Sequence, residues 1–262
     1  MNYRSIELEI KNHIATIWLN RPGIYNAFDN LVFKELIEAF REVNKSSKIY
    51  IVILRGRGEA FSSGADLNWM MQSGKLKLKK SRIDSNVISK CLDTFYNLSK
   101  PTIVAAHKFV FGGALGFLCA ADIAICSKNT VLSLSETRLG LAPAVILPYI
   151  LTRINEHKAS MLIYTGKKFS SLEAFQYGMI DFLPEDNKME ETLQDIIQDI
   201  LKSSSKALNE SKKLIRMISP FIQKKIIEKT IDSITKLKRS KDGQEGMRAF
   251  LEKRPPKWIF ES

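Results

Sequence analysis

The chain is poor in the side chains that bind metals or form disulfides. Its 262 residues include only three cysteines and three histidines. The cysteines (Cys91, Cys119 and Cys126) form no C-x-x-C pair, and no two histidines stand four residues apart. An odd number of unpaired cysteines is typical of buried thiols in a reducing compartment. We therefore expect no disulfide framework, no metal site and no metal cofactor.

Long apolar runs are also missing. The longest one, residues 109–121, has thirteen residues and includes three glycines. A bilayer-spanning helix needs about 20 apolar residues. The first residues lead straight into an alternating segment at 6–10, without a basic-then-apolar leader. The sequence therefore predicts a cytoplasmic protein without a membrane span.

Acidic residues are few relative to basic ones, and the net charge is +12. Residues 201–262 hold 16 Lys/Arg against 7 Asp/Glu, and residues 75–82 form a second basic patch. Such faces are either solvated helix surfaces or attract polyanions, with coenzyme A and nucleic acid as the two candidates. Aromatic residues are not interleaved with the basic ones, which argues against a nucleic-acid partner.

Buried strands alternate with helices over the first part of the chain, which excludes an all-α or all-β fold. After Pro148 the chain reads as almost entirely helical, and no Gly/Ser/Pro linker precedes its last quarter. The expected strands lie at 6–10, 13–19, 49–54, 101–106, 123–126 and 131–134, and residues 11–12 suit a tight hairpin between the first two. Asp29 is expected to cap one helix, further helices begin at Asp66 and at about Ile83, and two more cover 204–217 and 220–238.

Two strands run into turns of small residues that open helices. The strand at 49–54 is followed by FSSGADL at 61–67, and the strand at 101–106 by FGGALG at 111–116. Two such turns side by side can direct two backbone N–H groups at one point. That arrangement is an oxyanion hole, in which fixed donors stabilise developing negative charge.

Two other motifs fail on inspection. Ser62 and Ser63 lie outside any G-x-S-x-G elbow and have no persuasive histidine partner, which argues against a serine hydrolase. Gly56-x-Gly58 begins a dinucleotide fingerprint, but Phe61 replaces its third glycine.

The chain resembles the crotonase (enoyl-CoA hydratase/isomerase) family over nearly its whole length. The motifs that carry the resemblance occur in family order, at 19–22 (LNRP), 25–28 (YNAF), 61–67 (FSSGADL), 112–113 (GG), 120–124 (AADIA), 135–141 (SETRLGL) and 250–254 (FLEKR). The resemblance implies an α/β fold, a spiral of repeated ββα units at 1–200 that binds acyl-CoA. It also implies a C-terminal helical region at 201–262 that packs on the core and on neighbouring subunits of a homotrimer or dimer of trimers.

The resemblance also implies a site. The backbone N–H groups of Ser63 and Gly113 would form the oxyanion hole, and Glu136 would carry the proton. Coenzyme A enters as part of the substrate, so no separate cofactor is expected. The substrate would contact the residues Asn26, Ala27, Ser63, Gly64, Ala65, Asp66, Trp69, Gly112 and Gly113.

One position departs from the two-glutamate hydratases of this family. Their second glutamate falls three residues after the oxyanion glycine, where this chain has Gly116. A single glutamate fits an enoyl-CoA Δ-isomerase, whereas residues 64–70 and 135–144 resemble bacterial methylglutaconyl-CoA hydratases. We expect a hydratase that adds water across the 2,3 double bond of an enoyl-CoA, with the isomerase as the alternative. A non-catalytic acyl-CoA binder and an RNA-binding protein are remoter alternatives.

Overall fold

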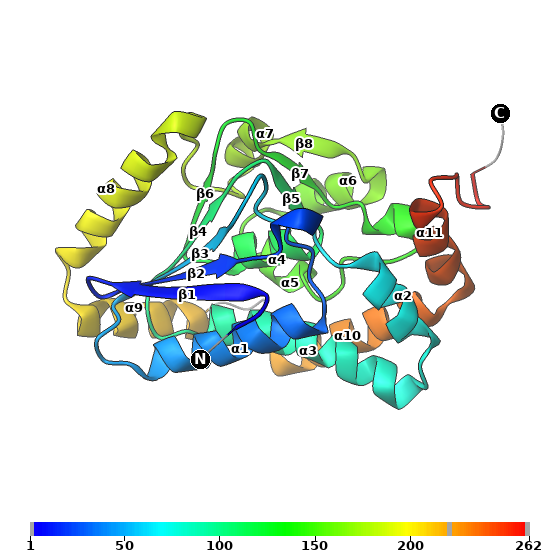
Figure 1. Cartoon of the computed structure of the whole chain (residues 1–262), viewed down its shortest axis with the longest axis horizontal. Helices are drawn as coiled ribbons and strands as arrows, with labels where there is room; N and C mark the ends of the chain where they lie inside the picture. The colour runs from blue at the N-terminus through cyan, green and yellow to red at the C-terminus, as the bar shows by residue number, and fades with distance from the viewer. Residues whose placement is uncertain (1–2, 219–221, 260–262) are drawn as a thin grey trace.

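A five-stranded sheet forms the centre of the computed structural model, which describes residues 3–218 and 222–259 (Figure 1). The strand order is β1-β2-β3-β4-β6, antiparallel between β1 and β2 and parallel from β2 onward. The strands are β1 (Ile6–Lys11), β2 (Ile14–Leu19), β3 (Ile51–Gly56), β4 (Thr102–Ala106) and β6 (Ile123–Cys126). The tight turn between β1 and β2 places Asn12 and His13 at positive φ, as the predicted hairpin requires.

A second, three-stranded sheet stands beside the first in the order β5-β7-β8. Its strands are β5 (Phe109–Phe111), β7 (Val131–Ser133) and β8 (Lys168–Ser170). β5 continues directly from β4, so the chain passes from one sheet to the other just before the Gly112–Gly113 turn. The described chain after Pro148 is mostly helical, as expected, and β8 is an exception that is too short to show strand periodicity.

Helices cover both faces of the main sheet. They are α1 (Asn30–Lys45), α2 (Leu67–Lys75), α3 (Leu78–Tyr96), α4 (Gly113–Ala120), α5 (Leu147–Ile150), α6 (Glu156–Thr165), α7 (Ser171–Gln176), α8 (Met189–Leu201), α9 (Ser205–Ile218), α10 (Lys224–Arg239) and α11 (Lys241–Leu251), with 3₁₀ turns η1 (Pro22–Ile24), η2 (Glu136–Leu139) and η3 (Asp186–Lys188). The predicted cap at Asp29 is present, because its side chain accepts hydrogen bonds from the first N–H groups of α1. Asp66, where a helix was expected to begin, caps α2 in the same way.

Two helix boundaries differ from the prediction. α3 begins at Leu78 rather than near Ile83, so most of the basic segment at 75–82 is helical. The helix predicted at 220–238 corresponds to α10, and residues 220 and 221 lie outside the described part of the chain.

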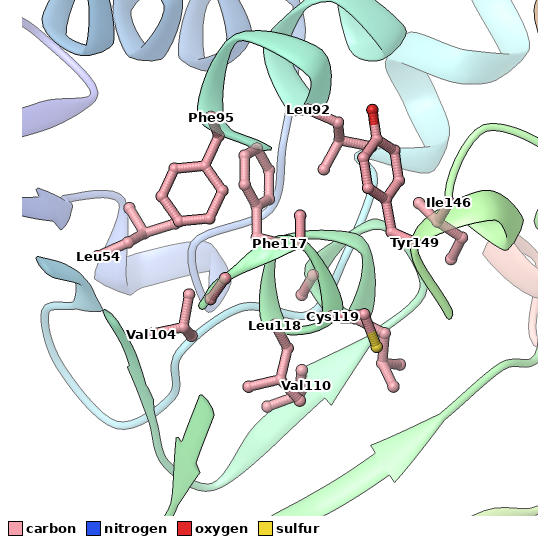
Figure 2. Packing of buried hydrophobic residues seen from close by; sticks show 14 of the residues in the cluster. Leu54, Leu92, Phe95, Val104, Val110, Phe117, Leu118, Cys119, Ile146 and Tyr149 are labelled. Atoms are coloured by element: carbon pink, nitrogen blue, oxygen red, sulfur yellow. The ribbon is translucent and has the colours of Figure 1, made fainter. Parts of the chain in front are cut away.

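α4 lies in the middle of the main hydrophobic core. Phe117 projects from α4 and packs against Phe95 on α3 at 5.7 Å between ring centroids, and Leu92, Ile146 and Tyr149 also lie around the helix in Figure 2. A separate cluster on the opposite face of the sheet packs Ile51, Ile53, Ile103, Ala105 and Ile125 against α8. The core thus holds α4 rigidly, and with it the turn that precedes it.

The last two helices lie at one end of the molecule, on the right in Figure 1. α10 packs on α2 and α3, and α11 packs on α2 and η2. Within residues 3–218 and 222–259, no helix is both long and apolar enough to span a membrane.

Candidate active site

The two predicted turns lie side by side. The Ser62 N–H donates to the Phe109 carbonyl at 3.0 Å, and the Phe111 N–H donates to the Ser62 carbonyl at 3.2 Å. Gly64 then passes so close to β5 that a Cβ there would lie 2.5 Å from the Phe111 carbonyl oxygen. Gly64 also has φ of +89°, which favours glycine. The FSSG segment is therefore fixed alongside the end of β5.

Glu136 joins these turns from a distant part of the sequence. A Cβ built on Gly112 would lie 3.1 Å from Glu136 Oε1, so the carboxyl group lies directly against this glycine. Gly112 has φ 50° and ψ −118°, a conformation that only glycine adopts readily. Its N–H donates to the Ser133 carbonyl of β7 at 3.0 Å, which ties the turn to the strand preceding η2. The structure thus brings together Glu136, Gly112 and the start of α4.

The Glu136 carboxyl group is enclosed and incompletely paired. The residue as a whole is partly exposed, but its Oε2 atom is buried and has no hydrogen-bond partner within the described part of the chain. Burial raises the pKa of Glu136 to about 7, opposed by a hydrogen bond from its own backbone. A carboxyl group with a pKa near 7 can both accept and give a proton at neutral pH.

The two predicted oxyanion donors differ in their surroundings. The Gly113 N–H, at the first position of α4, meets no acceptor among residues 3–218 and 222–259. The Ser63 N–H donates to the Tyr25 carbonyl at 2.8 Å. Tyr25 and Asn26 hold this carbonyl in place through consecutive left-handed conformations, with φ of 49° and 55°. One donor is therefore free, and the other is occupied by the protein itself.

The side chains of Asn26 and Ala27 shape the loop that carries Tyr25 and are not exposed to contact a substrate. Asn26 is 2% exposed, and its amide nitrogen donates to the carbonyls of Arg57 at 2.9 Å and Ala60 at 2.8 Å. Its Oδ1 accepts from the Arg21 N–H at 2.8 Å, and Ala27 is also buried. The Asn26 side chain is thus fully used in shaping the loop that carries Tyr25, and only backbone atoms there remain for a ligand.

Ala65, Asp66 and Trp69 continue the FSSGADL segment into α2. Ala65 pairs with Phe28 in a short parallel bridge, and Asp66 Oδ1 accepts from the Trp69 N–H at 3.2 Å. The Trp69 ring is partly buried against Phe33, with centroids 5.9 Å apart. These residues fix the entrance of α2 beside the turns.

The position of the absent second glutamate is closed by apolar side chains. A Cβ on Gly116 would lie 2.5 Å from Ile146 Cγ2 and 3.2 Å from Leu92 Cδ2 (both labelled in Figure 2). Both Ile146 and Leu92 are buried. This face of α4 therefore has no room for a second carboxylate at that position.

Sequence reasoning missed Tyr25 and Ile146. The Tyr25 carbonyl acts through its backbone, which no side-chain pattern marks. Ile146 reaches Gly116 from thirty positions away in the chain, and only the fold reveals the contact. The three cysteines are buried and free, and among the described residues no group of three or more His, Cys, Asp or Glu side chains could hold a metal ion.

The fold and the two adjoining turns define a crotonase-type α/β spiral. The model for the enoyl-CoA hydratase/isomerase family matches residues 9–260, so the chain belongs to this family. It is 35% identical over 246 residues to YhaR of Bacillus subtilis, a candidate enoyl-CoA hydratase/isomerase, covering 94% of this chain and 95% of the relative.

Other relatives are named for both kinds of reaction. The trans-2-decenoyl-[acyl-carrier-protein] isomerase of Streptococcus mutans is 26% identical, covering 98% of this chain and 99% of the relative. The crystal structure of an enoyl-CoA hydratase from Shewanella pealeana superposes with a TM-score of 0.80 at 30% identity, covering 98% of this chain and 96% of that one. Membership of the family thus gives hydratase or isomerase chemistry in general, without a choice between the two.

Proposed function

We propose that the protein is an acyl-CoA hydratase that adds water across the 2,3 double bond of an enoyl-CoA. The observation that carries this proposal is the enclosed Glu136 carboxyl group against Gly112, with an unpartnered Oε2 and a pKa of about 7. An unpaired buried carboxyl oxygen lowers stability, which is expected where the group reacts.

In this mechanism Glu136 acts first as a base and then as an acid. The carboxylate takes a proton from water as the water oxygen forms a bond to the β carbon. The π electrons of the double bond move toward the thioester, giving an enolate with negative charge on the carbonyl oxygen. The protonated Glu136 then gives that same proton to the α carbon. One carboxyl group is sufficient because the proton that it removes from water is the proton that it returns.

The enolate oxygen would be stabilised by the N–H groups of Gly113 and Ser63. A donor of this kind contributes on the order of 3 kcal/mol to transition-state stabilisation. Gly113 also begins an eight-residue helix, whose dipole favours negative charge at this end. For Ser63 to take part, the substrate oxygen must replace the Tyr25 carbonyl as its acceptor.

Isomerisation is the second candidate, and the apolar surroundings of Gly116 favour it. Ile146 and Leu92 fill the place where a second carboxylate could hold or activate water. A Δ-isomerase needs only one base that removes a proton from the α carbon of a 3-enoyl thioester and returns it at the γ carbon. Glu136 alone can perform that transfer.

The acyl group proposed is a branched, methylglutaconyl-type thioester, on the resemblance at 64–70 and 135–144. Arg138 could pair with the carboxylate of such a substrate, but its contacts in the structure do not support that role. Its guanidinium donates to the Thr165 carbonyl at 2.9 Å and packs over Gly166. A homotrimer or dimer of trimers remains our expectation for the assembly.

The test follows the ultraviolet absorbance of the conjugated enoyl thioester. A 2-enoyl-CoA, 3-methylglutaconyl-CoA and a 3-enoyl-CoA are offered separately to the wild type and to Glu136→Gln. Loss of conjugation from either of the first two substrates, absent in the variant, supports hydration. Gain of conjugation from the third alone replaces hydration by isomerisation. No change with any of the three contradicts an enzymatic role and leaves the acyl-CoA-binding and RNA-binding alternatives.

A further inference from the structure

The turn that carries Glu136 contributes little to the core by itself. η2 is four residues long, and none of its residues is fully buried. Backbone hydrogen bonds close the turn: the Gly140 N–H donates to the Thr137 carbonyl at 3.1 Å, and the Leu141 N–H donates to the Glu136 carbonyl at 3.0 Å. The position of the carboxyl group must therefore depend on the neighbours that hold η2 from outside.

One neighbour is α6. The Thr137 hydroxyl donates to the Ile163 carbonyl at 2.8 Å, and the Arg138 guanidinium binds the Thr165 carbonyl. These bonds fix the outer side of η2 through side chains.

The other neighbour is α11, which meets η2 backbone to backbone. A Cβ on Gly246 would lie 2.4 Å from the backbone carbonyl of Leu139, at the end of η2. A Cβ on Gly140, the residue that closes the turn, would lie 2.5 Å from the backbone carbonyl of Asp242. Both distances are shorter than real Cβ contacts, so any side chain at either place would push the two segments apart.

The glycines of α11 are unfavourable for the helix itself. Gly243 and Gly246 lie within an eleven-residue helix, where each glycine costs about 1 kcal/mol relative to alanine. Close approach of the backbone explains why glycine occurs at these positions. A Cβ built on Gly243 would lie 2.2 Å from the Leu237 carbonyl oxygen. The helix is anchored further by Gln244, whose amide nitrogen donates to the carbonyls of Lys238 at 2.8 Å and Met71 at 3.2 Å. α11 thus connects the Glu136 turn with α2, which begins directly after the FSSGAD segment.

We propose that Gly246 is a positioning residue for Glu136: it seats α11 on η2 and so holds the Glu136 carboxyl group in its enclosed place against Gly112. This inference rests on the proposed role of Glu136 as the acid–base group. A methyl group at residue 246 lifts α11 from Leu139, loosens η2 and admits water to the carboxyl group. Water then lowers the pKa of Glu136 toward its ordinary value, because the burial that raised it is lost.

The experiment measures the Glu136 pKa directly, so that it does not depend on turnover. The full chain is labelled with [δ-¹³C]glutamate, the Glu136 resonance is assigned by its absence in Glu136→Gln, and its shift is followed against pH by NMR. In Gly246→Ala the pKa is expected to fall by about one unit or more. Turnover of the preferred enoyl-CoA is expected to fall at least about tenfold with little change in KM, since the substrate site remains while the proton carrier moves.

The matched control is Leu193→Ala on α8, which is buried on the opposite face of the sheet. It lowers thermal stability without touching η2 or α11, and it is expected to leave the Glu136 pKa and kcat unchanged. A Gly246→Ala protein that loses stability like this control but keeps the wild-type pKa overturns the proposal.

A second variant covers the case in which Gly246→Ala does not fold. Gln244→Met removes both hydrogen bonds that anchor α11 without adding a clash. A downward shift of the Glu136 pKa of about half a unit supports the positioning role, and an unchanged pKa contradicts it. If the wild type turns over none of the three thioesters, the proposed function fails, whereas the pKa comparison still decides whether α11 positions the carboxyl group.

Discussion

The first turn of α4 has two unlike sides. On one side, which we call the polar side, the Glu136 carboxyl group lies against Gly112, and the Gly113 N–H meets no acceptor in the described part of the chain. On the other, the apolar side, Gly116 is closed by Ile146 and Leu92. Gly112 and Gly116 are four residues apart, about one helical turn, yet only the polar side carries groups that can move a proton or bind an anion. Because the apolar side has no carboxyl group, both proton transfers of the proposed reaction depend on Glu136 alone.

The largest effect is expected from removing that group. Glu136→Gln keeps the shape of the polar side but cannot accept a proton, so kcat should fall by about 10³-fold or more, within the range seen for lost acid–base groups. Stopped-flow or steady-state absorbance of the enoyl thioester measures the loss, and circular dichroism checks the fold. Turnover within about tenfold of wild type would mean that another group carries the proton.

The polar side should also make stability depend on pH. The pKa of Glu136 is raised from 4.5 to about 7, so the folded state holds a proton between these values that the unfolded state releases. Wild-type stability should therefore fall as pH rises from about 4.5 through 7, by a total of about 3 kcal/mol from this group.

Glu136→Gln removes this dependence. The stability of the variant relative to wild type should rise by that same amount between pH 4.5 and pH 8, as measured by urea unfolding. A constant difference between the two proteins over this range would show that Glu136 titrates normally.

The apolar side can be tested by adding one methyl group. Gly116→Ala places a Cβ 2.5 Å from Ile146 Cγ2, whereas Gly113→Ala places one at an ordinary 3.6 Å from Phe28. We expect Gly116→Ala to lose about 2 kcal/mol of stability through overpacking and Gly113→Ala to lose much less. In an Ile146→Ala background, which removes the clashing methyl group, Gly116→Ala should cost less than it does in the wild type. Equal stability of the two single variants would argue against the closed apolar side.

The smallest effect concerns the two donors of the polar side. The Ser63 amide is bonded to the Tyr25 carbonyl, whereas the Gly113 amide has no acceptor among the residues that the structure describes, so Ser63 should exchange its hydrogen more slowly. Hydrogen-exchange NMR measures both amides, first alone and then with a saturating acyl-CoA. If the substrate oxygen replaces Tyr25, the Gly113 amide gains protection while Ser63 keeps it. Fast exchange at Ser63 in the free protein would contradict the bond to Tyr25.

Local signals in the sequence predicted much of this fold. The hairpin at Asn12, the cap at Asp29, the helix start at Asp66 and the strand at 123–126 each follow from residues that lie next to one another in the chain. The contacts that complete the candidate site could not be predicted in this way. Tyr25 contacts Ser63, and Leu139 contacts Gly246, through backbone atoms. Backbone contacts of this kind cannot be predicted from the pattern of side chains in the sequence. The glycines within α11 were the one available hint.

The contact of Gly246 with Trp258 has an optical consequence. A Cβ on Gly246 would lie 2.7 Å from the indole of Trp258, so this ring rests on the seated helix. The chain has three tryptophans, and the other two lie elsewhere: the guanidinium groups of Arg55 and Arg57 lie over the Trp18 ring, and Trp69 lies on α2. With Trp18 and Trp69 replaced by phenylalanine, the emission of the remaining indole becomes an intrinsic gauge of α11. Its wavelength would report, without any added dye, whether the end of the chain is docked or open to water.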